Sequence, residues 1–352
     1  MTVDVRLPRP RVEGPSAWIG AELARRPEEW IYRLSPAEIA ELETATATQR
    51  GRELATLRRA DFPLPSLGPI LDRLRAEVLN GRGFVLIRGL PVEGRPIAES
   101  AAAYWAIGSY FGNARSQNAK GHLLGHVRDL GMSSKDPNVR IYQTTERQNF
   151  HTDSCDIVGL LCLKAAKSGG LSSLTSSMSI YNVMAERRPD LLARLFLPFA
   201  TDRRGEVPEG KLPWFDIPVF NDYEGFLSAI YAPHYVRSSQ RFPQARRLTA
   251  EDLEALDMFD RLAEDPELRL DMELQPGDMQ FVHNHTTLHD RTAFEDWPEP
   301  EKKRHLLRLW LAAPDARPLP PVYAERYGSV TIGDRGGIIC PGTRLHAPLE
   351  PQ

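Results

Sequence analysis

A histidine and an aspartate stand two positions apart in the segment "NFHTDSCDIVG", which runs from Asn149 to Gly159. Residues two apart in an extended chain point to the same side, so His151 and Asp153 would present an imidazole and a carboxylate together. Alone, such a pair is common on protein surfaces. Two histidines and one carboxylate, however, form the facial triad that holds iron(II) in non-heme oxygenases and leaves coordination sites open.

The segment "PGDMQFVHNHTTLHDRTAF" offers three histidines that could complete a triad, namely His283, His285 and His289. The pattern of residues does not choose between them. Whichever histidine is the ligand, the other two would be structural.

Two arginines near the C-terminal end of the chain could bind carboxylates. In "KRHLLRLWL", Arg304, Arg308 and Trp310 fall on one face of a predicted strand. Four residues along a strand span about 13 Å, so the two guanidiniums suit two different carboxylates. The planar fork of arginine matches a carboxylate with two parallel hydrogen bonds. Together with a metal triad, this predicts a 2-oxo diacid whose keto-acid end chelates the metal and whose far carboxylate pairs with arginine.

Apolar, β-branched runs predict the strands that must position these residues. "FVLIRGL", "IVGLLCLKAA" and "RHLLRLWLA" are typical of buried strands. "LRLDMEL" and "MQFVHN", joined by a turn at Pro276-Gly277-Asp278, are expected to pair with each other. The stretch 201–247 is rich in glycine, proline and aromatic residues, and is expected to form a lid or insert over the site.

The 352 residues carry a net charge of −3, with acids and bases interspersed, which gives no argument for nucleic acid or an anionic membrane as partner. The N-terminus lacks the apolar region of a signal peptide, and no stretch approaches the length of a membrane span. Three cysteines argue against a disulfide framework. We therefore expect a cytoplasmic protein with a small-molecule substrate, and leave homo-oligomer formation open.

No change of composition forces a second domain. We expect a single oxygenase domain over residues 1–352, with an N-terminal helical arm (1–65), a core (66–330) that includes the 201–247 insert, and a C-terminal tail (331–352).

Four motifs occur in order: "FHTD", "SGGLSSLTSS", "PGDMQFVHNHTTLHDRTAF" and "KRHLLRLWL". Over about residues 80 to 315 the chain resembles the taurine dioxygenase and 2,4-dichlorophenoxyacetate dioxygenase family. The resemblance implies a mainly β fold with flanking helices (α+β) and a double-stranded β-helix core, the jelly-roll of clavaminate synthase-like proteins. It also implies iron(II), 2-oxoglutarate and O2, with His151, Asp153 and His289 as metal ligands and no other catalytic residue.

By the same resemblance, Arg304 and Ser172 would bind the far carboxylate of 2-oxoglutarate, although the division of roles between Arg304 and Arg308 stays open. The expected reaction is oxidation of a C–H bond, by hydroxylation, desaturation or cyclisation, with release of succinate and CO2. A carboxylate-bearing metabolite is the expected substrate. Its candidate binding residues are Arg308, Gln117, Asn118, Trp214 and Phe215, with Phe220, Tyr223 and Tyr231 as further aromatic candidates.

Three alternatives remain at this stage. A zinc hydrolase can also use two histidines and a carboxylate. A jelly-roll protein could bind 2-oxoglutarate without turnover. An oxygenase that modifies proteins is the third, although the chain shows no basic groove.

Overall fold

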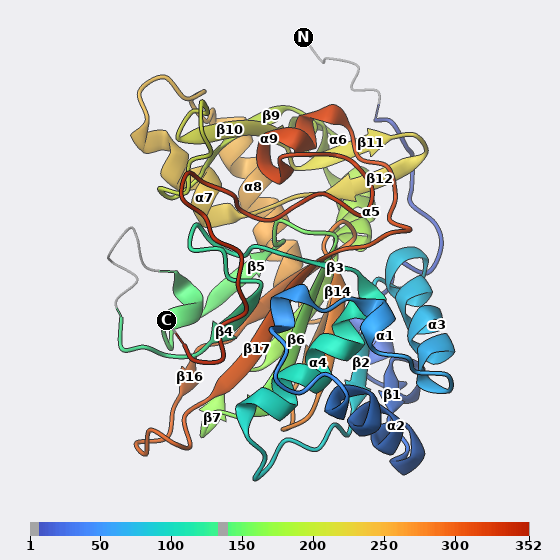
Figure 1. Cartoon of the computed structure of the whole chain (residues 1–352). Helices are drawn as coiled ribbons and strands as arrows, with labels where there is room; N and C mark the ends of the chain where they lie inside the picture. Colours follow the sequence, from blue (N-terminus) through green and yellow to red (C-terminus); the bar gives the residue numbers. More distant parts are fainter. Residues whose placement is uncertain (1–6, 133–139, 352) are drawn as a thin grey trace.

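Two β-sheets form the centre of the molecule. The computed structural model describes residues 7–132 and 140–351, and Figure 1 shows their arrangement. Along the larger sheet the strands are β1 (Ile31–Arg33), β2 (Phe84–Arg88), β14 (Met279–His283), β6 (Ile157–Lys164), β17 (His305–Ala312) and β3 (Asn113–Arg115), and β4 (Leu124–Val127) also pairs with β17. The smaller sheet has the order β13 (Arg269–Met272), β8 (Ser172–Ser176), β15 (Thr287–Arg291) and β5 (Gln148–His151).

The inner faces of the two sheets share one apolar cluster. Leu86, Val158 and Leu306 of the larger sheet pack in the same cluster as Leu174 and Leu270 of the smaller one. Two sheets that bury their apolar faces against each other make a sandwich. This arrangement, which is that of a jelly-roll, confirms the predicted fold class.

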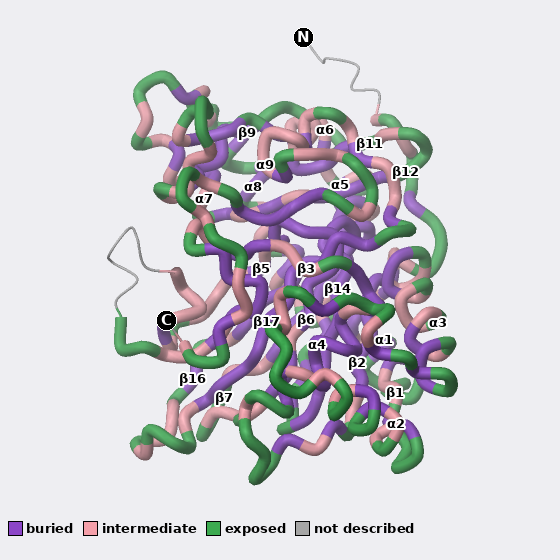
Figure 2. Tube along the Cα trace, viewed as in Figure 1, coloured by how far each residue is buried: buried purple, intermediate pink, exposed green. Residues whose placement is uncertain are grey.

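Helices cover the outer faces of both sheets (Figure 1). Helices α2 (Pro36–Ala47), α3 (Leu67–Asn80) and α4 (Ile97–Phe111) pack with the larger sheet. On the smaller sheet lie α5 (Ser177–Arg187), α6 (Pro189–Arg194) and α8 (Ala250–Ala263). Helix α2 begins at a capping box, in which Ser35 and Glu38 satisfy each other's backbone N–H groups. Figure 2 shows the result: the strands are buried, while the helices expose their outer sides.

The stretch 201–247 contains short strands and a helix joined by loops. Two antiparallel pairs join β9 (Pro198–Asp202) to β10 (Trp214–Pro218) and β11 (Phe220–Tyr223) to β12 (Phe226–Ala229), and α7 (Pro233–Ser238) follows. Further short elements include α1 (Gly20–Leu23), α9 (Ala324–Tyr327), β7 (Ser168–Gly169) and β16 (Phe294–Glu295). No helix in the described ranges is both long and apolar enough to span a bilayer.

The predicted pairing of "LRLDMEL" with "MQFVHN" is wrong. β13 pairs with β8 in the smaller sheet, whereas β14 pairs with β2 and β6 in the larger one. The turn at Gly277, where φ is +87°, carries the chain from one sheet to the other and packs against the backbone of Leu90. Arg88 on β2 clamps the buried carboxylate of Asp278 with two hydrogen bonds, which ties the turn to the larger sheet.

Segments from both the N-terminal and the C-terminal parts of the described chain are built into the fold. The N-terminal region, expected to be helical, also supplies β1, which extends the larger sheet in parallel with β2. In the C-terminal stretch, Gly337 and Ile338 donate backbone hydrogen bonds to Ser154 and Ser116. One sheet thus takes strands from residue 31 to residue 312, and the single-domain organisation stays a prediction.

Candidate active site

His151, Asp153 and His289 meet at one edge of the smaller sheet. His151 ends β5 and lies directly opposite His289 on the antiparallel strand β15. Asp153 follows two residues after His151, and its two carboxylate oxygens lie 3.7 Å from Nε2 of His151 and 3.6 Å from Nε2 of His289. One ligand atom from each residue falls within 4.8 Å of the others, a spacing that could hold a metal ion.

Neighbouring groups orient these ligands. Nδ1 of His151 lies 2.8 Å from the carbonyl oxygen of Asn149 and donates to it, which puts the lone pair on Nε2, where the side-chain amide of Gln148 donates to it at 3.0 Å. The indole N–H of Trp310 donates to Oδ2 of Asp153 at 2.7 Å, and the backbone N–H of Asp153 donates to the side chain of Asn284 at 2.9 Å.

The protonation states of the ligands suit a divalent cation. Burial lowers the pKa of His151 to about 3, so its imidazole is neutral. Burial by itself would raise the pKa of Asp153, but the Arg308 guanidinium and the contacts with His289 outweigh it and hold that pKa below its usual range. Neutral imidazoles and an ionised carboxylate are the forms that bind metal.

The other two histidines lie apart from this cluster. His283 contacts the Thr286 hydroxyl at 3.1 Å, and His285 pairs with the buried carboxylate of Asp156 at 3.0 Å. Both rings are fully buried. The structure therefore brings His289, of the three candidates, to the pair formed by His151 and Asp153.

On the His289 side lies an inner cavity that contains two buried arginines. Arg304 and Arg291 both line it, and both guanidiniums lie over the ring of Phe294, at 5.2 and 4.8 Å. Neither forms an ion pair within the described residues. Nη1 of Arg304, and Nε and Nη1 of Arg291, are buried without a hydrogen-bond partner there. Burial lowers the pKa of Arg304 to about 10 and that of Arg291 to about 9, so both remain charged at neutral pH.

Buried charges without partners are costly unless a ligand compensates them. Ser172 lines the same cavity and donates its hydroxyl to Gln280 at 3.0 Å. The inner cavity thus offers two unpaired guanidiniums beside the metal ligands, an arrangement that fits the far carboxylate of a 2-oxo diacid.

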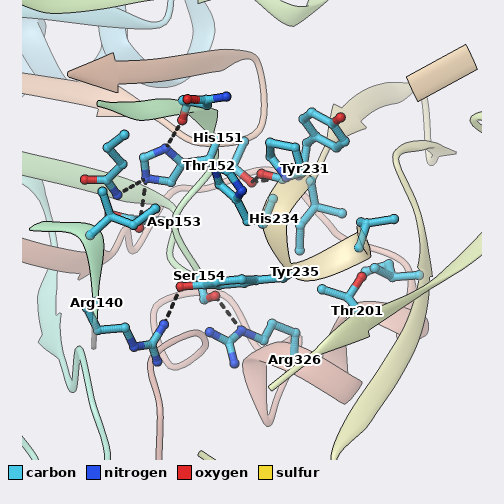
Figure 3. A pocket seen from close by; sticks show the side chains of 18 of the residues that line it. Arg140, His151, Thr152, Asp153, Ser154, Thr201, Tyr231, His234, Tyr235 and Arg326 are labelled. Carbon is cyan, nitrogen blue, oxygen red and sulfur yellow. Dashed lines mark hydrogen bonds and ion pairs between the residues drawn. The ribbon is translucent and has the colours of Figure 1, made fainter. Parts of the chain in front are cut away.

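An outer cavity, drawn in Figure 3, lies on the Asp153 side. Apolar and aromatic side chains form much of its wall, including Phe215, Ile217 and Tyr231. Three guanidiniums also line it, those of Arg140, Arg308 and Arg326. Gln148, His151 and Arg308 border both cavities, whereas Asp153 borders only the outer one and His289 only the inner one.

The structure separates the residues predicted to bind substrate. Arg308, Gln117 and Phe215 line the outer cavity, as does Tyr231. The side chain of Gln117 holds Arg308 in place with two hydrogen bonds. Its amide oxygen accepts from Nε of Arg308 at 2.7 Å, and its amide nitrogen donates to the Arg308 carbonyl.

The remaining candidates do not line the outer cavity. Trp214 stacks on Phe242 with ring centroids 5.3 Å apart. Asn118 accepts a hydrogen bond from the backbone of His122 in a turn. Phe220 is fully buried in the cluster beneath the smaller sheet, and Tyr223 lies at the end of β11. For these four side chains, substrate binding stays a prediction without support from the geometry.

Sequence reasoning missed several groups at the site. Arg291 could have been found, because it lies two residues after His289 on the same strand and therefore shares its face. The bond from Trp310 to Asp153 joins residues 157 positions apart and had no local signal. Arg140, which precedes a short 3-10 turn, and Arg326, in the four-residue helix α9, belong to no motif.

Comparison with known proteins agrees with this geometry. The sequence pattern of the family described as "Taurine catabolism dioxygenase TauD, TfdA family" matches residues 46–310. The chain belongs to the TauD/TfdA family. Among its relatives, the FR-33289 synthase of Streptomyces rubellomurinus is 33% identical over 88% of this chain and 92% of its own length. The taurine hydroxylase-like protein SAT17 of Stachybotrys chartarum is also 33% identical, over 83% of this chain and 77% of its own.

Solved structures of iron oxygenases share the fold. An asparagine oxygenase, in complex with Fe(II), 3-hydroxyasparagine and succinate, has a TM-score of 0.62 at 18% identity and covers 80% of this chain and 93% of its own. The non-heme iron oxygenase OrfP, in complex with Fe, succinate and hydroxy-L-Arg, has a TM-score of 0.60 at 14% identity, covering 80% and 94%.

As a member of this family, the chain is an iron(II)- and 2-oxoglutarate-dependent dioxygenase that uses O2 and acts on a small molecule. The predicted family, enzyme class and cofactors are confirmed.

Proposed function

We propose that this dioxygenase oxidises a C–H bond of a small, carboxylate-bearing metabolite in the outer cavity, with hydroxylation as the reaction. The observation that carries the proposal is the position of the triad between two cavities, one with unpaired arginines and one with an apolar, aromatic wall. In the proposed reaction, iron(II), 2-oxoglutarate and O2 supply the oxidation of the C–H bond and release succinate and CO2.

The three residues of the triad share one role, which is to bind the metal. His151, Asp153 and His289 hold iron(II), and Trp310 fixes the carboxylate orientation through its hydrogen bond to Oδ2. Because His289 borders the inner cavity and Asp153 the outer one, the cosubstrate binds on the His289 side. Substrate then approaches from the Asp153 side.

Arg304 binds the far carboxylate of 2-oxoglutarate, with Arg291 as a second cation. Support comes from the unpaired, buried nitrogens of both side chains. Ser172 belongs to the same wall. This assignment leaves Arg308, which is held by Gln117 and lies beside Asp153, to face the substrate.

The names of relatives favour hydroxylation of a small polar metabolite. Two solved structures with this fold are complexes with 3-hydroxyasparagine and hydroxy-L-Arg. A relative 30% identical over half of this chain is a uridine-5'-phosphate dioxygenase of Amycolatopsis. Desaturation and cyclisation remain alternatives at the same iron site, and Phe215 and Tyr231 are the aromatic residues placed to contact the substrate.

The proposal includes a cytoplasmic protein whose partner is this small molecule. The three cysteines are unpaired, which supports a reducing compartment. A net charge of −3 gives no attraction to nucleic acid or an anionic membrane. Homo-oligomer formation stays a prediction.

An anaerobic titration with iron(II) and 2-oxoglutarate tests the core of the proposal. The complex should show a weak visible charge-transfer band, and a panel of small carboxylates screened for succinate release should then identify substrates. Activity restored by zinc, and independent of 2-oxoglutarate, would instead indicate a hydrolase. A band without succinate release from any metabolite would indicate a non-catalytic binding protein.

A further inference from the structure

Arg326 lines the outer cavity from a part of the chain that follows both sheets. It lies in the short helix α9, after the last strand of the larger sheet. The family pattern ends at residue 310, so this arginine lies outside the matched region. Its Nε donates to the hydroxyl of Ser154 at 2.6 Å, and Ser154 directly follows Asp153 (Figure 3). The guanidinium is therefore anchored one residue from the metal triad.

The positive charge of Arg326 has no carboxylate to balance it within the described residues. The neighbouring Arg140 pairs with Glu206, and Glu325 pairs with Lys211 and Arg203. Asp153 is directed to the metal. Burial and the nearby Arg140 lower the pKa of Arg326 to about 10, so the guanidinium still carries its charge at neutral pH.

The hydrogen-bond groups around Arg326 are donors. Its two terminal NH2 groups have no partner within the described residues, since Nε makes the single side-chain bond. The Ser154 hydroxyl accepts from Arg326 and keeps its own proton free to donate. The Tyr235 hydroxyl likewise accepts from Arg140 and keeps its proton. Ser154 and Tyr235 both line the cavity with Arg326.

We propose that Arg326, Ser154 and Tyr235 form a binding site for an oxyanion group of the substrate, either carboxylate, sulfonate or phosphoryl. A cluster of donors around an unbalanced guanidinium matches a group that only accepts hydrogen bonds. The apolar wall around Phe215, whose ring lies 5.8 Å from the Arg326 guanidinium carbon, strengthens this attraction because it excludes water. The inference rests on the proposed function and adds a second anchor beyond Arg308.

The test uses simple anions as probes on the protein loaded anaerobically with iron(II) and 2-oxoglutarate. Acetate, methanesulfonate and methylphosphonate are titrated by calorimetry, with neutral acetamide as a control, and the order of affinities identifies the anion. Wild type should bind at least one anion and not acetamide. Arg326→Gln should weaken that binding at least tenfold.

Arg203→Gln is the matched control. Arg203 also lies over the Phe215 ring, at 4.9 Å, and bonds to the carbonyls of Leu212 and Glu325, but it does not line the cavity, so its loss removes the same charge nearby without removing a residue of the cavity wall. Its anion affinity should stay within threefold of wild type. An equal loss in both variants, unchanged binding in Arg326→Gln, or no anion binding by wild type would overturn the site.

The charge-transfer band separates this inference from the proposed function. A band retained in Arg326→Gln shows that the metal and cosubstrate sites are intact, so lost anion binding is local. A band absent already in wild type would contradict the proposed function itself. If Arg326→Gln does not fold, Ser154→Ala tests the site instead, because it keeps the guanidinium and removes one hydrogen-bond donor. This variant should weaken anion binding several-fold, and an unchanged affinity would overturn the site.

Discussion

His151 and His289 face each other across two antiparallel strands, with their ring centroids 4.2 Å apart. The pairing of β5 with β15 therefore sets the separation of the two imidazoles. A slip of one residue would turn one ring to the opposite face of the sheet. The metal site depends on strand register as much as on the identity of its ligands.

Replacing His289 should abolish the metal site. His289→Ala leaves two ligands, and we expect loss of the charge-transfer band and of 2-oxoglutarate-dependent succinate release. His283→Gln is the comparison variant, because His283 lies outside the cluster. A normal band in His289→Ala, together with a lost band in a folded His283→Gln protein, would reverse the assignment.

Trp310→Phe keeps an aromatic ring but removes the indole N–H that donates to Asp153. Loss of such a bond to a metal ligand typically weakens metal affinity by about 10- to 100-fold. We expect a roughly tenfold increase in the dissociation constant for iron(II), measured by anaerobic titration. Trp105→Phe removes a comparable bond, from the indole N–H on helix α4 to the Leu57 carbonyl, and should leave iron affinity unchanged because Trp105 lines neither cavity.

Arg304→Gln should weaken 2-oxoglutarate binding selectively. Truncating one partner of a buried, hydrogen-bonded charge pair costs about 3 kcal/mol, or roughly 100-fold in affinity. The charge-transfer band should appear only at higher 2-oxoglutarate, with iron affinity unchanged. Arg291→Gln should have a smaller effect, because Arg291 is also held by the Glu146 carbonyl. The opposite order would exchange the roles of the two arginines.

Adjacent aromatic residues on β10 should behave differently. Phe215 lines the outer cavity, whereas Trp214 stacks on Phe242 outside it. Once a substrate is found, Phe215→Leu should raise its KM several-fold and Trp214→Leu should not. Trp214→Leu should instead lower the thermal midpoint, since it loses a buried stacking contact. Equal KM effects in both variants would argue against this division.

Buried neutral histidines predict that the metal-free protein loses stability in mild acid. Burial lowers the pKa of His285 to about 4, and burial with the neighbouring His126 lowers that of His305 to about 3. In the unfolded chain both titrate near 6.5. The unfolded state therefore binds more protons below pH 6.5, and the free energy of unfolding falls as pH decreases.

Urea unfolding of the chelated protein between pH 7.5 and 5 measures this dependence. We expect a constant free energy of unfolding above about pH 7 and a fall of up to roughly 2 kcal/mol per histidine by pH 5. The raised pKa of the buried Asp290 opposes the trend only at the acid end. His305→Gln should have a shallower slope than wild type, and a flat profile in wild type would refute the explanation.

How far the sequence predicts the site depends on whether residues share a strand. His151 and Asp153 are two apart in an extended segment, so alternation brings them together without tertiary information. His283 and His289 look equivalent by the same rule. They lie on different sheets, because β14 ends at His283 and β15 begins at Thr287. Only the family resemblance selected His289, and the fold shows why spacing could not.

Sheet crossings explain the other errors in the predicted fold. β13 and β14 are close in sequence and joined by a turn, which resembles a hairpin, yet the turn connects opposite sheets. No local sequence pattern predicted that Arg326 lies at the site, for a related reason. Its position depends on how the chain after β17 folds back over Ser154, and no local pattern encodes that path.

The triad and the cosubstrate arginines belong to strands or their immediate ends, whereas most of the outer cavity wall comes from segments outside the two sheets, including α7 and α9. Loops and short excursions tolerate change far better than packed sheets do. Gene duplication followed by drift in those segments could therefore yield descendants with new metabolite preferences, each inheriting the oxidising machinery unaltered.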